Sequence, residues 1–176
     1  MYQPMSLLRL ATESDAALLS ELGARLFEQT FGAQNTADDM RLYLADAFRS
    51  ELVRANLSDP HQRTWIAEEG ANGAIGYAVL KRSPAPLHLQ AQQAAEIVRL
   101  YADQQWHGRG VGASLMDACL KQAREWKSEL VWLGVWEVNA RAIAFYQKHG
   151  FRSMGTQTFL LGTDVQNDLV MARRLD

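Results

Sequence analysis

Hydrophobic residues in the first third of the chain recur with the spacing of helices. The leucines that define the first helix face are Leu18, Leu19, Leu22 and Leu26. Thr12 and Asp15 precede them with the S/T-x-x-[DE] spacing of a helix-capping pair, which predicts where this helix begins. A second helix is predicted over residues 37–57, and it ends before Asp59-Pro60, because the residue preceding a proline avoids the helical region.

Short apolar runs rich in β-branched and aromatic residues predict the strands. We expect strands at residues 6–12, 64–69, 74–82, 96–102, 130–136, 158–163 and 168–175. Residues 70–73, GANG, have the composition of a hairpin turn, and further helices are predicted over 111–126 and 139–151. The order β-α-α-β-β-β-α-β-α-β-β, without repeat or linker, predicts one mixed α/β domain over residues 1–176.

Composition and charge narrow the class of protein. The formal net charge of −2 provides no basic excess for a nucleic-acid partner. The N-terminal residues lack the charged leader and apolar run of a signal peptide, and no apolar segment approaches the roughly 20 residues that cross a bilayer. We therefore expect a cytoplasmic protein that binds neither nucleic acid nor membrane. The single cysteine, Cys119, falls on the apolar stripe of a predicted helix and is expected to be buried.

Three glycines on alternate positions, Gly108, Gly110 and Gly112, stand between a predicted strand and a predicted helix. Ordering each glycine costs roughly 0.5–1 kcal/mol of additional chain entropy, and a tight turn requires only one of them. The free N–H groups at a helix start bind phosphate readily, and glycines remove the side chains that would hold a phosphate away. We therefore predict a phosphate-bearing ligand at this loop, with a ligand-free turn as the alternative.

A dinucleotide is the less favoured ligand for this loop. The segment GRGVGA satisfies G-x-G-x-x-[GA], and Glu137 stands where a ribose-binding acid would follow. However, only one strand-helix-strand unit follows the motif, which is too few for a doubly wound parallel sheet. The lysine-bearing phosphate loop GxxxxGK[ST] is absent from the sequence.

Two motifs together resemble the GNAT superfamily of acyl-CoA-dependent N-acetyltransferases. The family pattern [RQ]-x-x-G-x-[GA] falls on residues 107–112, HGRGVG, with His107 in place of the family's arginine or glutamine. The second motif is N-x₆-Y-x₃-G-F, formed by Asn139, Tyr146, Gly150 and Phe151. The resemblance is strong from about residue 65 onward. It implies a mixed α+β fold with a central, mostly antiparallel sheet that is splayed to admit acyl-CoA.

The resemblance implies an enzyme that transfers an acetyl group from acetyl-CoA, its co-substrate, directly to an amine, without a metal. The loop residues that would hold the diphosphate are His107, Gly108, Arg109, Gly110, Val111, Gly112 and Ala113. On the preceding strand, the backbone of Leu100 would stabilise the oxyanion, and Tyr101 and Ala102 would complete the stretch that bonds to pantetheine. Because these contacts use backbone atoms, the side chains there carry no diagnostic signal.

Two residues of the second motif have family roles and simpler alternatives. Tyr146 matches the family's tyrosine acid, which protonates the leaving thiolate, whereas the alternative is aromatic packing beside Phe145. Asn139 begins the same helix, where asparagine is among the best N-cap residues, and the resemblance adds a hydrogen bond to pantetheine. The cap and the pantetheine contact are compatible with each other.

The sequence carries fewer signals for the proton acceptor and the amine substrate than for the acetyl donor. Glu96 begins the strand that leads to the glycines and is the candidate base, with a solvated surface charge as the alternative. Glu28 is a second acid that could act through water, and Glu28 and Phe31 belong to the region where relatives bind the acceptor. The F-x-x-T-F segment there is similar to bacterial polyamine acetyltransferases.

Several acceptors and one non-catalytic function are consistent with this pattern. We expect a polyamine or other small amine as the acceptor. The alternatives are a protein N-terminus or lysine, or a module that binds acyl-CoA without turnover. Homo-oligomers, a homodimer among them, are common among such folds, and the sequence indicates no symmetry or interface.

Overall fold

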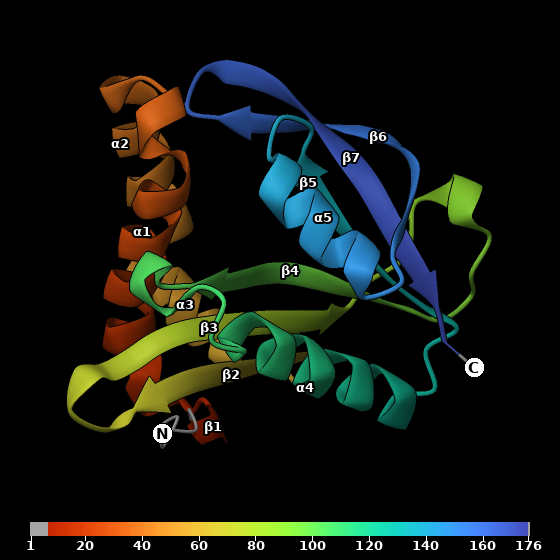
Figure 1. Ribbon diagram of the computed structural model, residues 1–176, viewed down its shortest axis with the longest axis horizontal. Coiled ribbons are helices and arrows are strands. Elements are labelled where there is room, and N and C mark those ends of the chain that lie inside the picture. Colours follow the sequence, from red (N-terminus) through yellow and green to blue (C-terminus); the bar gives the residue numbers. More distant parts are fainter. Residues whose placement is uncertain (1–6, 176) are drawn as a thin grey trace.

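The computed structural model describes residues 7–175. Ser6 of the first predicted strand, and the start of the segment considered as a signal peptide, lie outside the described residues. Seven strands form one sheet in the order β1-β2-β3-β4-β5-β7-β6 (Figure 1). The strands are β1 (Leu7–Leu10), β2 (Gln62–Glu69), β3 (Gly73–Arg82), β4 (Ala94–Ala102), β5 (Leu130–Trp136), β6 (Arg152–Leu161) and β7 (Asp164–Arg174).

Helices cover both faces of this sheet. The α-helices are α1 (Ala16–Phe31), α2 (Ala37–Ala47), α3 (Ser50–Leu57), α4 (Val111–Glu125) and α5 (Ala140–Lys148). In Figure 1, α4 and α5 lie in front of the sheet, whereas α1 and α2 stand at one end and α3 lies behind. This arrangement confirms the predicted mixed α+β fold. Within residues 7–175, no helix has the length and apolar character that crossing a membrane requires.

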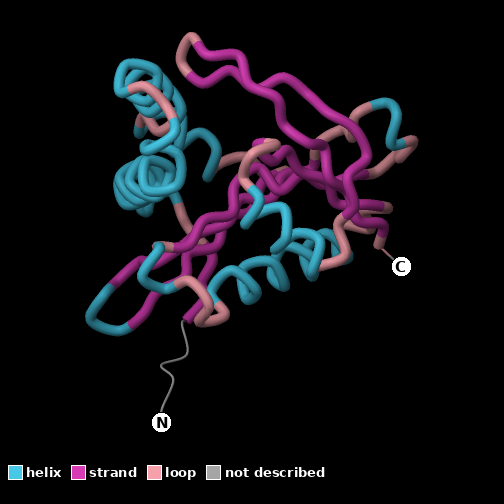
Figure 2. The backbone as a smooth tube through the Cα atoms, turned by 45° about the horizontal axis from the view of Figure 1, so that its top comes forward, coloured by secondary structure: helices cyan, strands magenta, loops and turns pink. Residues whose placement is uncertain are grey.

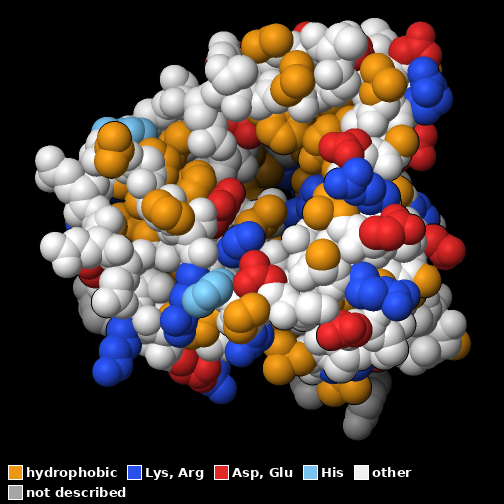
Figure 3. Space-filling view, turned by 180° about the vertical axis from the view of Figure 1, so that it is seen from behind, with side chains coloured by type: hydrophobic (Ala, Val, Ile, Leu, Met, Phe, Trp, Pro, Cys, Tyr) orange, Lys and Arg blue, Asp and Glu red, His pale blue; other side chains and the backbone are white. Residues whose placement is uncertain are grey.

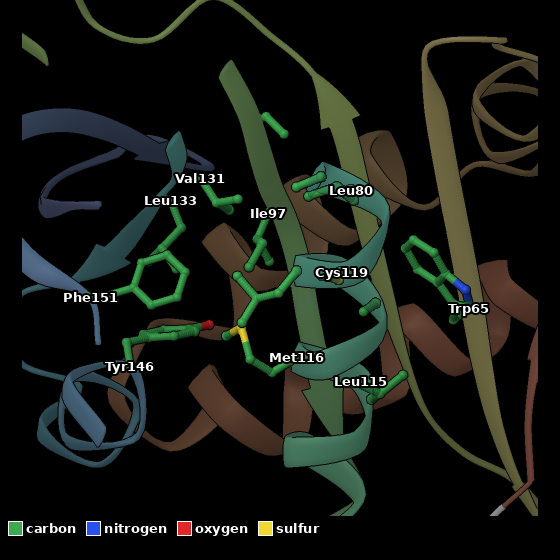
Figure 4. Packing of buried hydrophobic residues seen from close by; sticks show 14 of the residues in the cluster. Trp65, Leu80, Ile97, Leu115, Met116, Cys119, Val131, Leu133, Tyr146 and Phe151 are labelled. Carbon is green, nitrogen blue, oxygen red and sulfur yellow. The ribbon is translucent and has the colours of Figure 1, made fainter. Parts of the chain in front are cut away.

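Strands β2 and β3 are buried on both faces, which explains their nearly continuous apolar sequences. On β2, Ile66 packs with the leucines of α1, whereas its neighbours Trp65 and Ala67 pack in the cluster under α4. Figure 4 shows this second cluster, in which Leu115, Met116 and Cys119 of α4 lie over the sheet. Cys119 is fully buried, as the sequence predicts.

The structure differs from the prediction in dividing the helix expected over 37–57 into α2 and α3. The backbone is extended at Arg49, with φ −60° and ψ 137°, and the preceding Phe48 turns into the core, where it is 5% exposed. Gly23 of α1 leaves room for this ring, since a Cβ atom there would lie 2.6 Å from Phe48 Cδ1. The hydroxyl of Ser20 also donates a hydrogen bond to the Phe48 carbonyl. Tertiary packing of Phe48 therefore overrides the helical period of this segment.

Strands β4 and β5 are parallel, and every other neighbouring pair in the sheet is antiparallel. Their ladder joins only Ala94–Glu96 to Leu130–Trp132, although β4 continues to Ala102 and β5 to Trp136. Figure 2 shows the two halves of the sheet diverging beyond this short ladder. We call the gap between residues 97–102 of β4 and 133–136 of β5 the seam. It is the kind of opening for acyl-CoA that the resemblance to the GNAT superfamily implies.

Candidate active site

The glycine loop precedes α4 and has left-handed backbone at two of its three glycines. The φ angles are +76° at Gly108 and +86° at Gly110, and no atom lies within 4 Å of the position that a Cβ atom would occupy at either residue. Gly110 is the N-cap of α4, so the first N–H groups of the helix point out of its N-terminus without intrahelical acceptors. The loop therefore presents bare amides and the positive end of a helix dipole.

His107 fixes this loop to the end of β4. Its Nε2 atom lies 2.8 Å from the carbonyl oxygen of Ala102, so the ring bridges the loop and the strand. Asp103, between them, accepts a hydrogen bond of 3.1 Å from the Gln105 amide and pairs with Arg25 of α1. His107, which stands where the family pattern has arginine or glutamine, thus holds the loop against the end of β4.

A cavity of about 600 Å³ runs along the seam from the glycine loop to the face covered by α1 and α2. Its walls on the loop side come from α5 and the residue before it, and include Asn139, Ala142, Phe145 and Tyr146. Its opposite walls are mainly aromatic and include Phe27, Phe31, Tyr43 and Phe159. Figure 3 shows the face opposite to that of Figure 1, which is hollowed in its middle, with hydrophobic side chains in the hollow and charged side chains around it.

A bulge in β4 decides which side chains face each part of this cavity. Leu80 of β3 pairs with Ile97 and Val79 pairs with Arg99, so Val98 is an extra residue in β4. After the bulge, Leu100 and Ala102 pack with the cluster under α4. Arg99 and Tyr101 lie instead toward α1 and α2, where the Arg99 guanidinium is 4.3 Å from the centre of the Phe48 ring.

Comparison with known proteins identifies the family. Residues 24–151 match the Acetyltransferase (GNAT) family. An uncharacterized N-acetyltransferase of Mycobacterium bovis is 33% identical over 162 residues, which cover 92% of this chain and 99% of the relative. The chain belongs to the GNAT family. It is therefore an N-acetyltransferase, and enzymes of this family use acetyl-CoA.

Two further relatives of this GNAT chain bear on the fold and the substrate. The structure of the PaiA N-acetyltransferase of Thermoplasma acidophilum in complex with coenzyme A has a TM-score of 0.79 at 18% identity, and covers 97% of this chain and 99% of that chain. The spermine/spermidine N(1)-acetyltransferase of Bacillus subtilis is 31% identical over 62 residues, which are 35% of this chain and 41% of that protein. The first likeness shows the fold, and the second covers only part of the length.

Tyr146 of this GNAT chain reaches from α5 toward β4 with its hydroxyl foremost (Figure 4). The side chain is 8% exposed and lines the cavity. Burial raises the pKa of Tyr146, with a further contribution from Cys119, so the phenol remains protonated at neutral pH. Its ring also packs edge-on against Phe145 and Phe151, so the position serves the aromatic packing that the sequence offered as an alternative.

Asn139 is the N-cap of α5, as its position predicts. Its side-chain oxygen accepts a hydrogen bond of 3.2 Å from the amide of Ala142. The residue also lines the cavity. Asn139 therefore caps α5 and also lines the cavity. Its predicted hydrogen bond to pantetheine stays a prediction.

Two carboxyl groups line the cavity of the GNAT chain. Burial raises the pKa of Glu96, although a hydrogen bond with Ser83 and the charge of Lys81 act in the opposite direction. Burial, together with the nearby charge of Glu137, raises the pKa of Asp168 to about 6. A carboxyl group with this pKa ionises just below neutral pH and is well suited to accept a proton.

Asp168 was missed by sequence reasoning, although β7 carries a signal for it. Alternate residues of this strand face inward and are buried: Gln166, Asp168, Val170 and Ala172. An aspartate in such a period-two pattern is an acid on a buried face, which requires a partner or a function. Gly134 of β5 leaves space beside it, because a Cβ atom there would lie 3.0 Å from Asp168 Oδ2.

The two residues expected on the acceptor side are separated by the structure. Phe31 lines the cavity and meets Tyr101 and Trp136 edge-on, with ring centres 6.3 Å and 6.1 Å apart. Glu28 lies on the exposed face of α1 and is not among the residues that line the cavity. The acids inside the cavity are Glu96 and Asp168 instead.

Proposed function

We propose that this chain transfers the acetyl group of acetyl-CoA to the primary amine of a small acceptor by direct attack. The observation that carries this proposal is the seam, which joins the bare amides before α4 to the buried carboxyl group of Asp168 and the half-buried one of Glu96 on the other side of the sheet. The PaiA protein, which has the same fold, is in complex with coenzyme A.

The residues around the seam fit the donor. The amides from Gly108 to Ala113 offer N–H donors and a helix dipole to its diphosphate, and the absence of side chains at Gly108 and Gly110 permits close approach. Beyond the ladder with β5, β4 pairs with β3 along one edge only, so backbone groups on its other edge, such as the Leu100 N–H, can hydrogen-bond to the pantetheine arm. Asn139 stands on the facing side of the cavity.

The proposed reaction forms one bond and breaks another while two protons move. Bound acetyl-CoA supplies the activated thioester. The amine nitrogen bonds to the carbonyl carbon, the carbon–sulfur bond breaks, and the Leu100 N–H donates to the charge that develops on the carbonyl oxygen. Asp168 or Glu96 takes the proton from the attacking nitrogen, and the Tyr146 phenol gives its proton to the departing sulfur.

The walls of the cavity support the proposed class of acceptor. Carboxyl groups at Glu96 and Asp168 attract an ammonium group, and aromatic walls at Phe27, Phe31 and Phe159 favour a small or extended organic amine. A polyamine is one such acceptor, and partial similarity to the spermine/spermidine enzyme supports it. Glu28, one of the acids in the predicted acceptor region, is exposed and does not line the cavity.

Release of free thiol from acetyl-CoA in the presence of a panel of amines tests the proposal. We expect turnover with at least one small primary amine. Tyr146→Phe should reduce kcat by about 100-fold or more, because a general acid contributes at least that factor, while calorimetric affinity for CoA is preserved. If no amine supports thiol release, the proposed function is wrong. If Tyr146→Phe leaves kcat unchanged across the pH range, the acid is another group.

A further inference from the structure

We propose that the acceptor carries a carboxylate in addition to its amine, and that Arg99 binds this carboxylate in the seam cavity. The proposal rests on the proposed acetylation of a small amine and defines the class of that amine. It concerns the part of the cavity beyond the β4 bulge, where Arg99 lies among Phe27, Tyr43 and Tyr101.

Arg99 is held in a fixed position. The bulge at Val98 turns its side chain toward α1 and α2, and its guanidinium stacks on Phe48 at 4.3 Å from the ring centre. Phe48 is itself buried where α2 ends, beside Gly23 of α1. A guanidinium that is oriented in advance loses little freedom when it binds a planar, bidentate anion.

The positive charge of Arg99 has no acidic partner among residues 7–175. None of the ion pairs within this range includes Arg99, and the polar groups that act on it are the hydroxyls of Tyr77, Tyr43 and Tyr101. Burial raises the pKa of Tyr77 and that of Tyr101, so both phenols are neutral. Because arginine keeps its charge at every accessible pH, this part of the cavity is positive.

Two other arginines of the chain, Arg9 and Arg25, are paired with carboxylates. Arg9 pairs with Asp15 at 2.8 Å and with Glu68 at 2.9 Å, and Arg25 pairs with Asp103. Arg63 and Arg173, which are also partly buried, donate to backbone carbonyls instead. Among residues 7–175, Arg99 donates to neither a carboxylate nor a backbone carbonyl, and a partly buried guanidinium without such an acceptor is costly unless a ligand provides one.

The charges in the cavity match an amine that also bears one negative group. Glu96 and Asp168 suit the ammonium end, and Arg99 suits a carboxylate, which guanidinium groups bind bidentately. A phosphate shares this chemistry, but its second negative charge would be repelled by the two carboxyl groups of the cavity. A monoanionic carboxylate is therefore the better match. A polyamine, which carries only positive charge, leaves Arg99 unpaired.

The test is an acceptor panel in which each L-amino acid is measured beside its own carboxamide, with phosphoethanolamine and spermidine as further arms. Thiol release gives kcat/KM for each compound. For the best amino acid, we expect kcat/KM to exceed that of its amide by about 10- to 100-fold, the range for a hydrogen-bonded charge pair. Arg99→Met should remove this difference by lowering the value for the acid alone, and Arg99→Lys should restore part of it.

A matched control separates this effect from the loss of a stacked arginine. Arg82 lies over the Trp126 ring at 5.0 Å and does not line the cavity, so Arg82→Met removes a similar contact and should keep the preference. Calorimetry of the CoA-bound protein with the same acids and amides provides a second readout that does not require turnover.

The outcomes separate this inference from the proposed function. Equal kcat/KM values for acids and amides, or a preference for spermidine or phosphoethanolamine, overturn the carboxylate subsite and leave amine acetylation standing. Binding of an amino acid that depends on Arg99, without thiol release from any amine, overturns the proposed function and retains the subsite. Absence of both binding and turnover overturns both.

Discussion

Asp15 and Asp168 are equally buried, at 8% and 7% exposure, yet their pKa values move in opposite directions. A hydrogen bond from Arg9 is the main cause that lowers the pKa of Asp15 to about 2. No ion pair among residues 7–175 includes Asp168, and burial raises its pKa to about 6. The first carboxyl group therefore stabilises the fold where it is ionised, and the second destabilises the fold where it is ionised. This contrast is typical of a structural acid and a functional acid.

Asp168→Asn should stabilise the protein and damage its activity. The folded pKa of Asp168 lies above its unfolded value, so its contribution to stability falls as pH rises from about 4 through 6. We expect Asp168→Asn to raise the free energy of unfolding at pH 8 by roughly 2–3 kcal/mol, and by much less at pH 4. Urea unfolding at the two pH values measures this difference.

Asp15→Asn is the matched control, with the opposite sign. Its folded pKa is depressed, so its contribution is present above about pH 4 and disappears as pH falls through 2. Asp15→Asn should therefore destabilise the protein at pH 8.

If Asp168 is the base, Asp168→Asn also lowers kcat/KM by about 100-fold or more and removes the rise of kcat/KM with pH near 6. A similar loss in Glu96→Gln but not in Asp168→Asn would assign the base to Glu96.

At the scale of single elements, the glycine loop and α4 were predictable because their signals are local. Gly108 and Gly110 encode the positive φ angles, and Asn139 encodes the cap of α5, within a few residues of sequence. The break at Phe48 was not predictable, because its cause is the space beside Gly23 on another helix. A local pattern thus predicts an element, and a distant neighbour decides where the element stops.

Gly110→Ala and Gly73→Ala separate backbone strain from binding at the loop. Both glycines have positive φ angles, +86° and +65°, and at both positions an added Cβ atom would have no neighbouring atom within 4 Å. Gly110→Ala should cost about 1–2 kcal/mol of stability, because L-residues avoid the left-handed region. Gly73→Ala should cost more, because its ψ of −140° lies in a region that is essentially restricted to glycine. We expect only Gly110→Ala, at the N-cap of α4, to raise the KM for acetyl-CoA. An equal effect of the two variants on this KM would show that the loop amides do not hold the donor.

At the scale of the whole molecule, the site depends on three features of strand pairing that lie far apart in the sequence. The bulge at Val98 turns Arg99 toward α1, the pairing of β7 with β5 brings Asp168 beside Gly134, and the short ladder between β4 and β5 opens the seam. Bulges and registers depend on long-range pairing, so neither Arg99 nor Asp168 could be assigned to the cavity in advance. The family motifs predict the donor side and leave the acceptor side open.

Binding of CoA along the seam should stabilise the entire domain. A ligand that binds only the folded chain adds about 2.7 kcal/mol at a concentration 100 times its Kd. For a domain of this size, that corresponds to an increase in Tm of roughly 5–10 °C. Thermal unfolding with and without CoA measures it, with NADH as the matched nucleotide. A larger shift with NADH than with CoA would favour the dinucleotide ligand instead.

The short ladder between β4 and β5 also affects how readily the protein is degraded or aggregates. Two strand edges in the middle of the sheet keep donors and acceptors that no other strand of the ladder satisfies, and such edges are templates for association with foreign chains. Acetyl-CoA bound along the seam would hydrogen-bond to these two edges and cover them. Scarcity of coenzyme A should then shorten the survival of the polypeptide, through proteolysis or aggregation, before any shortage of acetyl groups limits its catalysis.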